Sequence, residues 1–247
     1  MKVVFFGTPD FAVACLKALV ESGQSICAVV TAPDKPAGRG LKLQFSAVKK
    51  YALEHHLEVL QPEKLKEPVF IEKLKSYQAE VQVVVAFRML PEVVWNMPKY
   101  GTINLHASLL PQYRGAAPIN WAIINGEKIT GVTTFRLQHA IDTGGVLLQE
   151  QVAIQPDETA GTLHDKLMNI GAILMVKTIE GIEAGTLTEH PQKNLPALKS
   201  APKLFTETAQ IDWNQSAEKI LNLIKGLSPY PGAFSQLNGK KMKVFSA

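Results

Sequence analysis

Short apolar runs alternate with amphipathic segments along most of the chain. Val3–Phe6, Cys27–Val30 and Val81–Ala86 are apolar runs of the kind that a parallel sheet buries on both faces. Helical periodicity follows these runs at residues 11–19, 46–56, 68–76, 91–96 and 118–125. Strands that alternate with helices predict an α/β domain with a Rossmann-like, doubly wound and mostly parallel sheet.

The pattern continues with further elements. It predicts strands at residues 57–60, 101–106, 131–137 and 146–154, the last two as an antiparallel pair. The longest helical pattern covers residues 162–184. Residues 31–45 are predicted to form a polar loop, and Ser46 is predicted to cap the helix that follows it.

The pattern breaks at residues 187–202, which are polar and contain three prolines. We predict a linker there, between a catalytic domain at 1–186 and a smaller unit at 203–247. The smaller unit is predicted to hold a helix at 216–227 and a hairpin that turns at Asn238-Gly239. So short a unit is expected to be only part of a second domain.

Composition narrows the class of protein. With 46% hydrophobic and 19% charged residues and a net charge of +4, the chain is typical of a globular protein. No apolar run reaches the ~20 residues of a membrane helix, and the N-terminus lacks a signal-peptide pattern, so we expect no membrane contact and a cytoplasmic location. Cys15 and Cys27 are predicted to be buried free thiols, and the histidine spacing predicts no metal site.

Candidate chemistry begins at residues 104–106. Asn104 and His106 lie two residues apart on a predicted strand, so their side chains project from the same face. An amide donor and a titratable imidazole on one face are suited to stabilising an oxyanion that forms on an acyl carbon. Taken singly, an Asn at a strand end often caps a loop, and a His is often structural. Asp142 lies between two strand-like runs, where it is either a turn residue or a carboxylate that orients His106. His139 is predicted to be a surface residue.

The same segment carries a family resemblance. Asn-x-His-x-Ser-Leu-Leu-Pro-x-Tyr-Arg-Gly-Ala-x-Pro at 104–118 resembles the signature of the folate-dependent formyltransferases. Two other stretches are similar to the branch of this family that formylates initiator tRNA. One is Ala-Pro-Asp-Lys-Pro-Ala-Gly-Arg-Gly at 32–40, and the other is the tail with Gln-Ile-Asp-Trp at 210–213 and Pro-Tyr-Pro-Gly-Ala at 229–233. The resemblance runs nearly the whole chain.

The resemblance implies a fold, an activity and partners. The fold would be the formyltransferase fold, followed by the start of a small β-barrel-type C-terminal domain that is incomplete here. The activity would move a formyl group from 10-formyltetrahydrofolate to the α-amine of methionine on initiator methionyl-tRNA. Folate and that tRNA would be the partners, with no metal, and we expect a monomer.

The resemblance also implies site residues. A catalytic triad would consist of Asn104, His106 and Asp142. The folate contacts would be Phe87, Arg88, Met89 and Leu90 on one segment, and Ser108, Leu109, Leu110 and Pro111 on another. The tRNA contacts would include Lys35, Arg39 and Lys42. Arg88 stands where the family commonly has Gly, and Gly145 stands where it commonly has Asp.

Two other functions remain open at this point. One is a related formyltransferase that acts on an amino-sugar nucleotide, another small amine or water. The other is a catalytically silent module that binds tRNA or folate. The 32–40 loop and the 210–213 tail disfavour a small-molecule acceptor, and the intact residues Asn104, His106 and Asp142 disfavour a silent binder.

Overall fold

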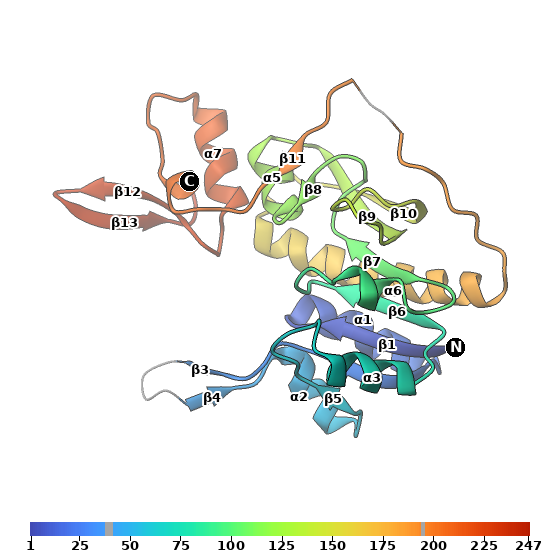
Figure 1. Ribbon diagram of the computed structural model, residues 1–247. Coiled ribbons are helices and arrows are strands. Elements are labelled where there is room, and N and C mark those ends of the chain that lie inside the picture. The colour runs from blue at the N-terminus through green and yellow to red at the C-terminus, as the bar shows by residue number, and fades with distance from the viewer. Residues whose placement is uncertain (38–41, 194–195) are drawn as a thin grey trace.

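The computed structural model describes residues 1–37, 42–193 and 196–247. Its central sheet has seven strands within this part of the chain, in the spatial order β10 (Val146–Ala153), β9 (Ile129–Arg136), β7 (Thr102–His106), β6 (Val81–Val85), β1 (Lys2–Gly7), β2 (Ser25–Val30) and β5 (Val59–Leu60). The strands from β7 to β5 are parallel, whereas β9 is antiparallel to both β7 and β10. The predicted doubly wound, mostly parallel sheet is confirmed (Figure 1).

Helices cover both faces of the sheet. Those of the main body are α1 (Asp10–Glu21), α2 (Ala47–Glu54), α3 (Pro68–Ser76), α4 (Glu92–Trp95), α5 (Pro118–Ile124) and α6 (Ala160–Glu183). In β1, Val3 and Phe5 pack with α1, α2 and α6, whereas Val4 and Phe6 pack on the other face with α3 and α4. This alternation explains why the strand is an unbroken apolar run, because both of its faces are covered.

Smaller elements lie around the main body. They are the hairpin β3 (Lys35–Ala37) and β4 (Lys42–Gln44), the pair β8 (Arg114–Gly115) and β11 (Ser200–Ala201), the 3-10 turn η1 (Glu207–Ala209), helix α7 (Ala217–Gly226), and the hairpin β12 (Ala233–Leu237) and β13 (Lys240–Val244). The hairpin predicted to turn at Asn238-Gly239 is confirmed. Among the helices of the described residues, none has the length and apolar character to cross a membrane.

The structure confirms some of the local predictions at residues 15–46 and contradicts others. The Ser46 hydroxyl accepts the Lys49 N–H at 3.0 Å, so the predicted cap is confirmed. The prediction of a plain polar loop at 31–45 is wrong, because Lys35–Ala37 and Lys42–Gln44 pair as antiparallel strands. Backbone pairing of so short a hairpin needs no apolar alternation, so the sequence pattern does not reveal it. Cys15 is buried as predicted, but Cys27 is only half-buried, because β2 begins at the edge of the core.

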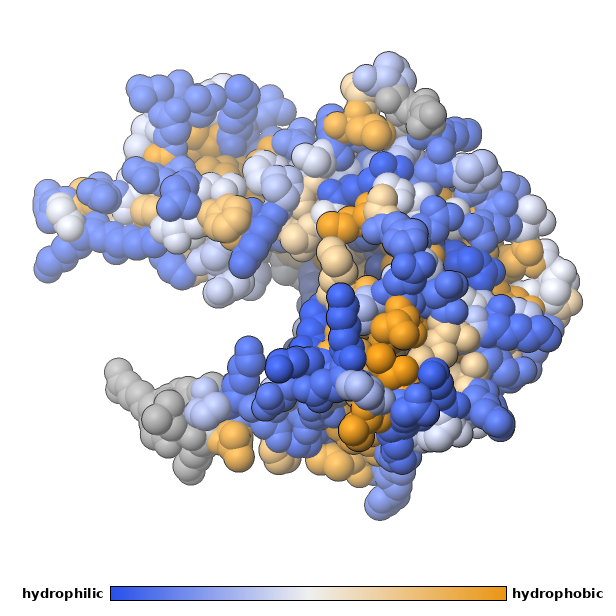
Figure 2. All heavy atoms as spheres, viewed as in Figure 1, coloured by the Kyte–Doolittle hydropathy of each residue, from blue (hydrophilic) through white to orange (hydrophobic). Residues whose placement is uncertain are grey.

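The C-terminal segment docks on the main body through helix α7. It has its own small core, to which Ile211, Ile224 and Phe234 contribute. The Asn120 side chain of α5 donates a hydrogen bond to the Gly226 carbonyl at 2.8 Å, and an added Cβ at Gly226 would lie 2.5 Å from Ile124. The two helices therefore pack closely because a glycine lies between them. Figure 2 shows a hollow between the β12–β13 hairpin and the β3–β4 hairpin.

The predicted division into a domain at 1–186, a linker and a unit at 203–247 stays a prediction. Described residues of the 187–202 segment nevertheless make specific contacts with the main body. His190 pairs with Val146, and β11 pairs in parallel with β8.

Candidate active site

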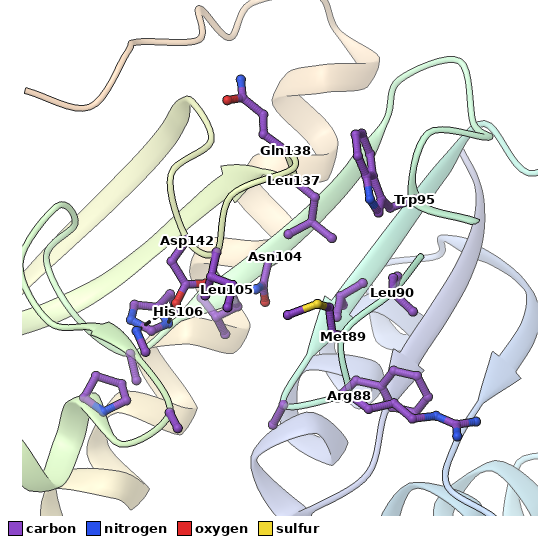
Figure 3. A pocket seen from close by; sticks show the side chains of 18 of the residues that line it. Arg88, Met89, Leu90, Trp95, Asn104, Leu105, His106, Leu137, Gln138 and Asp142 are labelled. Atoms are coloured by element: carbon purple, nitrogen blue, oxygen red, sulfur yellow. Dashed lines mark hydrogen bonds and ion pairs between the residues drawn. The ribbon is translucent and has the colours of Figure 1, made fainter. Parts of the chain in front are cut away.

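A cavity of about 610 Å³ lies at the carboxyl edge of the sheet, where β6 and β7 end. Phe87, Leu90, Trp95 and Leu137 give it largely apolar walls (Figure 3). Crevices at this edge are where open α/β sheets bind ligands. An apolar cavity with a few converging polar groups is suited to a flat heterocyclic ligand with polar edges.

Strand β7 supplies two polar groups to this cavity. Asn104 and His106 both line it, as their spacing on the strand predicts. Their neighbours Ile103 and Leu105 are buried on the core side and fix the orientation of the strand. No hydrogen bond from a described residue engages the Asn104 amide, so its N–H groups are available to a ligand.

The protonation pattern of His106 follows from its partners. The side chain is almost fully buried, and Nε2 lies 2.8 Å from the Tyr113 carbonyl oxygen. Because a carbonyl can only accept, Nε2 carries a proton and donates it. The Nδ1 atom faces the Asp142 carboxylate at 3.8 Å, so this is the ring nitrogen on the side of the carboxylate.

Asp142 reaches the site from the loop after β9. Its Oδ2 atom accepts the Gly115 N–H at 2.9 Å and faces His106, and the side chain is about 11% exposed. The carboxylate is therefore more than a turn residue, since one oxygen is bound to a backbone donor and also faces the imidazole. Asn104, His106 and Asp142 thus line a single cavity.

Left-handed backbone conformations occur around this cavity. Ala86, Tyr113 and Asp142 have φ values of 46°, 60° and 53° although none is glycine. Such conformations cost on the order of 1 kcal/mol each and persist where neighbouring contacts hold them. Here Ala86 and Asp142 line the cavity, and Tyr113 supplies the carbonyl that binds His106.

The first predicted folate segment lines the cavity. Phe87, Arg88, Met89 and Leu90 all contribute to its wall. The Arg88 guanidinium donates to the carbonyl oxygens of Pro62 and Glu63, at 2.7 Å for the latter. Its charge is therefore bound to that backbone, and in Figure 3 the guanidinium points away from Asn104, His106 and Asp142.

The second predicted folate segment stays a prediction. Ser108, Leu109, Leu110 and Pro111 are not among the residues that line the cavity. The Ser108 hydroxyl donates to the Gln112 carbonyl at 2.6 Å, and the Leu110 N–H is bound to the Thr133 hydroxyl. These hydrogen bonds fix the turn that follows β7. The opposite wall comes from the loop 137–141 after β9, which the sequence pattern did not single out.

The residues predicted to contact tRNA are only partly described. Lys35 is exposed in β3, whereas Arg39 lies outside the described residues and so does the side chain of Lys42. His139 is exposed, as predicted, and lies 3.1 Å from Glu92 at the mouth of the cavity. Within the described ranges, no group of three or more His, Cys, Asp or Glu residues is arranged to hold a metal ion.

Three partners of the site were not predicted. The Tyr113 carbonyl and the Gly115 N–H orient His106 and Asp142, and Gln192 donates to the Asp142 carbonyl at 2.8 Å. Tyr113 and Gly115 lie in the Tyr-Arg-Gly part of the 104–118 motif, so the motif is a sequence signal that could have identified them. Gln192 has no sequence signal of its own.

Comparison with known proteins gives the site a context. Residues 1–179 match the formyl transferase family, and residues 203–247 match the formyl transferase C-terminal domain family. A methionyl-tRNA formyltransferase of Bacteroides fragilis is 55% identical over 240 residues, which cover 96% of this chain and 74% of the relative. The methionyl-tRNA formyltransferase of Azobacteroides pseudotrichonymphae is 56% identical over 249 residues, covering 99% and 77%.

Solved structures share the fold at lower identity. An N-formyltransferase from Helicobacter canadensis, solved with folinic acid and dTDP-3-aminofucose, superposes with a TM-score of 0.71 at 22% identity. The match covers 99% of this chain and 86% of that protein. At this identity the likeness supports the fold alone.

Proposed function

The chain belongs to the formyltransferase family, and from that membership we infer that it formylates the α-amino group of methionine attached to initiator tRNA. The observation that carries this inference is identity above one half, over nearly the whole chain, to methionyl-tRNA formyltransferases. The product would be N-formylmethionyl-tRNA for translation initiation. We therefore expect the protein to act in the cytoplasm. The monomeric state stays a prediction.

We propose 10-formyltetrahydrofolate as the formyl donor. The apolar walls of the main cavity suit the faces of a pterin ring, and the backbone at Arg88–Leu90 offers polar groups to its edge. The amide of Asn104, which has no hydrogen-bond partner among the described residues, lies on the wall of the same cavity. A carbonyl oxygen is the kind of group that this amide would bind.

The reaction moves one formyl group and one proton. The methionine amine forms a bond to the formyl carbon, the carbonyl electron pair moves to oxygen, and the bond to the folate nitrogen then breaks. Asn104 would donate an N–H to the oxyanion without changing its own charge. His106, with both ring nitrogens protonated and Nε2–H bound to the Tyr113 carbonyl, would stabilise the same oxygen through Nδ1–H. Asp142 would accept the amine proton, and the pair formed with His106 would return one proton to the folate nitrogen.

The tRNA would lie in the hollow between the two projecting hairpins. Lys240, Lys241 and Lys243 lie on β13 and Lys35 lies on β3, and these strands belong to the two hairpins on either side of the hollow in Figure 2. Cations on both sides of a hollow attract phosphates and give sequence-independent affinity. We propose that Lys35, Arg39 and Lys42 contact the acceptor end, where unpaired nucleotides give RNA its recognisable features.

An acceptor panel tests this function. Wild-type protein with 10-formyltetrahydrofolate is offered methionyl-tRNA, free methionine and a dTDP-amino sugar, and kcat/KM is measured for each. We expect methionyl-tRNA to be preferred by several orders of magnitude. Preference for the amino sugar would instead assign the chain to the branch of the Helicobacter canadensis enzyme, and formylation of none of the three would indicate a silent binder.

A further inference from the structure

Gln192, in the segment between α6 and β11, contacts the loop that carries Asp142. Its Oε1 atom accepts hydrogen bonds from Arg114 Nε at 3.0 Å and Nη2 at 2.6 Å. Its Nε2 atom donates to the carbonyl oxygens of Asp142 and Gly144, each at 2.8 Å. Because a guanidinium only donates and a carbonyl only accepts, these partners fix the orientation of the Gln192 amide.

These contacts hold Asp142 from two sides. One is direct, through the backbone carbonyl of Asp142. The other runs through Arg114, which is followed in β8 by Gly115, the residue whose N–H binds the Asp142 carboxylate at 2.9 Å. A single amide side chain therefore bridges the loop that bears the carboxylate and the strand that donates to it.

The loop requires such support. Asp142 has a φ of 53°, a left-handed conformation that is unfavourable for a non-glycine residue. An added Cβ at Gly144 would lie 1.6 Å from the Arg136 carbonyl oxygen, and one at Gly145 would lie 2.1 Å from the Glu189 carboxylate. The loop is thus packed tightly between the end of β9 and the segment that carries Gln192.

The same segment also supports the partner of His106. The Tyr113 N–H donates to the Lys199 carbonyl at 2.6 Å, and β11 pairs with β8 through Ser200 and Ala201. The Tyr113 carbonyl, held in this way, accepts the Nε2 proton of His106 at 2.8 Å. The segment between the two parts of the chain therefore contacts the groups that orient both the imidazole and the carboxylate.

We propose that Gln192 is a positioning residue for Asp142, which it holds against Gly115 and His106. The proposal rests on the proposed function, in which Asp142 accepts the amine proton. Loss of the amide would free the Asp142 end of the loop, increase the distance between Asp142 and His106, and slow the proton transfer, whereas Gln192 itself does not line the folate cavity. The effect should appear in kcat rather than in the KM for folate.

Two substitutions and a matched control test the proposal. Gln192→Met keeps the length of the side chain and removes every hydrogen bond. Gln192→Glu keeps an acceptor for Arg114 but turns a carboxylate oxygen toward two carbonyl oxygens. Each should lower kcat for methionyl-tRNA ~10-fold, which corresponds to ~1.4 kcal/mol in the barrier. The control is Gln151→Met, at an exposed β10 position where no described residue bonds to the side chain, and it should retain wild-type kcat.

A double-mutant comparison separates positioning from general loss of structure. If Gln192 acts through the carboxylate, Gln192→Met should slow the Asp142→Asn variant less than ~2-fold further, because coupled residues are not additive. A full ~10-fold further loss, or wild-type kcat in Gln192→Met itself, would overturn the proposal.

The His106 ring resonances give a readout that needs no substrate. In NMR spectra they should move in Gln192→Met and in Asp142→Asn, and stay unchanged in Gln151→Met. Resonances unchanged in Gln192→Met would overturn the positioning role. Resonances that move while wild-type protein formylates no methionyl-tRNA would support the positioning role and count against the proposed function.

Discussion

Asn104 differs from His106 and Asp142 because its polar group has no hydrogen-bond partner among the described residues. His106 and Asp142 are bound to the backbone at Tyr113 and Gly115, whereas no described residue bonds to the Asn104 amide. A donor that is fixed on a strand and is not bound by any residue of the described ranges is preorganised for charge that forms only during the reaction. The strand position of Asn104 therefore supports a role at the oxyanion.

Replacement of Asn104 tests that role. We expect Asn104→Ala to lower kcat ~10²–10³-fold, the usual cost of one oxyanion donor, with folate affinity little changed. The measurement is steady-state formylation at saturating substrates together with a folate titration. Asn169→Ala, at an exposed position of α6, is the matched control and should leave kcat unchanged. Equal kcat in both variants would remove Asn104 from the mechanism.

At the scale of elements, the turn after β7 depends on Thr133 of β9. The Thr133 hydroxyl donates to the Ser108 carbonyl at 2.6 Å and accepts from the Leu110 N–H at 3.2 Å and the Gln149 side chain at 2.9 Å. Thr133 is fully buried, so water does not compete for its hydroxyl. The hydroxyl fixes the turn that directly follows the catalytic strand.

Thr133→Val should therefore destabilise the protein. Removal of the hydroxyl leaves buried polar groups without a partner, and we expect the free energy of unfolding to fall by ~1–3 kcal/mol in urea denaturation. Thr130→Val, also buried on β9 but without a side-chain hydrogen bond to a described residue, should change it by less than ~0.5 kcal/mol. An equal loss in the two variants would show that packing, not the hydrogen bonds, accounts for the effect.

Glu127 connects α5 to the segment before β11. Its carboxylate binds the Tyr113 hydroxyl and the Lys199 ammonium, the latter at 2.6 Å. Burial acts to raise the pKa of Glu127, but the hydrogen bonds from Lys199 and Tyr113 outweigh it and lower the pKa below its ordinary value of 4.5. Burial, followed by the hydrogen bond to Glu127, raises the pKa of Tyr113 above its ordinary value.

A pH dependence follows from the sign of this shift. Because the folded-state pKa of Glu127 is lowered, its contribution to stability is fully present above about pH 4.5 and is lost as pH falls through the folded-state pKa. We expect the free energy of unfolding to fall less steeply below that pH in Glu127→Gln than in the wild type. Parallel pH curves for the two proteins would show that Glu127 makes no such contribution.

Elements with a strong local pattern were predictable, and contacts between distant segments were not. The apolar run at 81–86 predicted β6, and Ser46 predicted the start of α2. The two-residue strands β8 and β11 have no periodicity to detect, since their pairing depends on the tertiary structure. The motif predicted Asn104 and His106, but the contact of Gln192 with the Asp142 loop joins residues 50 positions apart, which no local pattern reports.

At the scale of the whole molecule, two hairpins that carry lysines lie on either side of the hollow. A large polyanionic substrate would explain this arrangement best. β12–β13 belongs to the C-terminal segment that docks through α7, and β3–β4 projects from the main body (Figure 1). The arrangement therefore agrees with an RNA substrate whose 3′ end reaches the cavity.

The hairpin cations should govern tRNA affinity. We expect Lys35→Ala and Arg39→Ala each to weaken tRNA binding and to reduce the slope of log K against log salt by ~0.7–0.9, with folate affinity unchanged. Filter binding over a salt series measures both quantities. Lys177→Ala, which removes an exposed charge from α6, is the control. Salt slopes that are the same in all four proteins would show that the β3–β4 hairpin does not contact the RNA.

The most direct test of the account is the single-turnover rate of formyl transfer to methionyl-tRNA by the wild type and by Asp142→Asn. With both substrates bound, we predict rapid appearance of formylmethionyl-tRNA in the wild type and a rate at least ~10²-fold lower in the variant, since the carboxylate that accepts the proton is lost. Asp157→Asn, at an exposed position, should match the wild type. Equal rates in the wild type and Asp142→Asn, or no formylated tRNA from the wild type, would contradict the account.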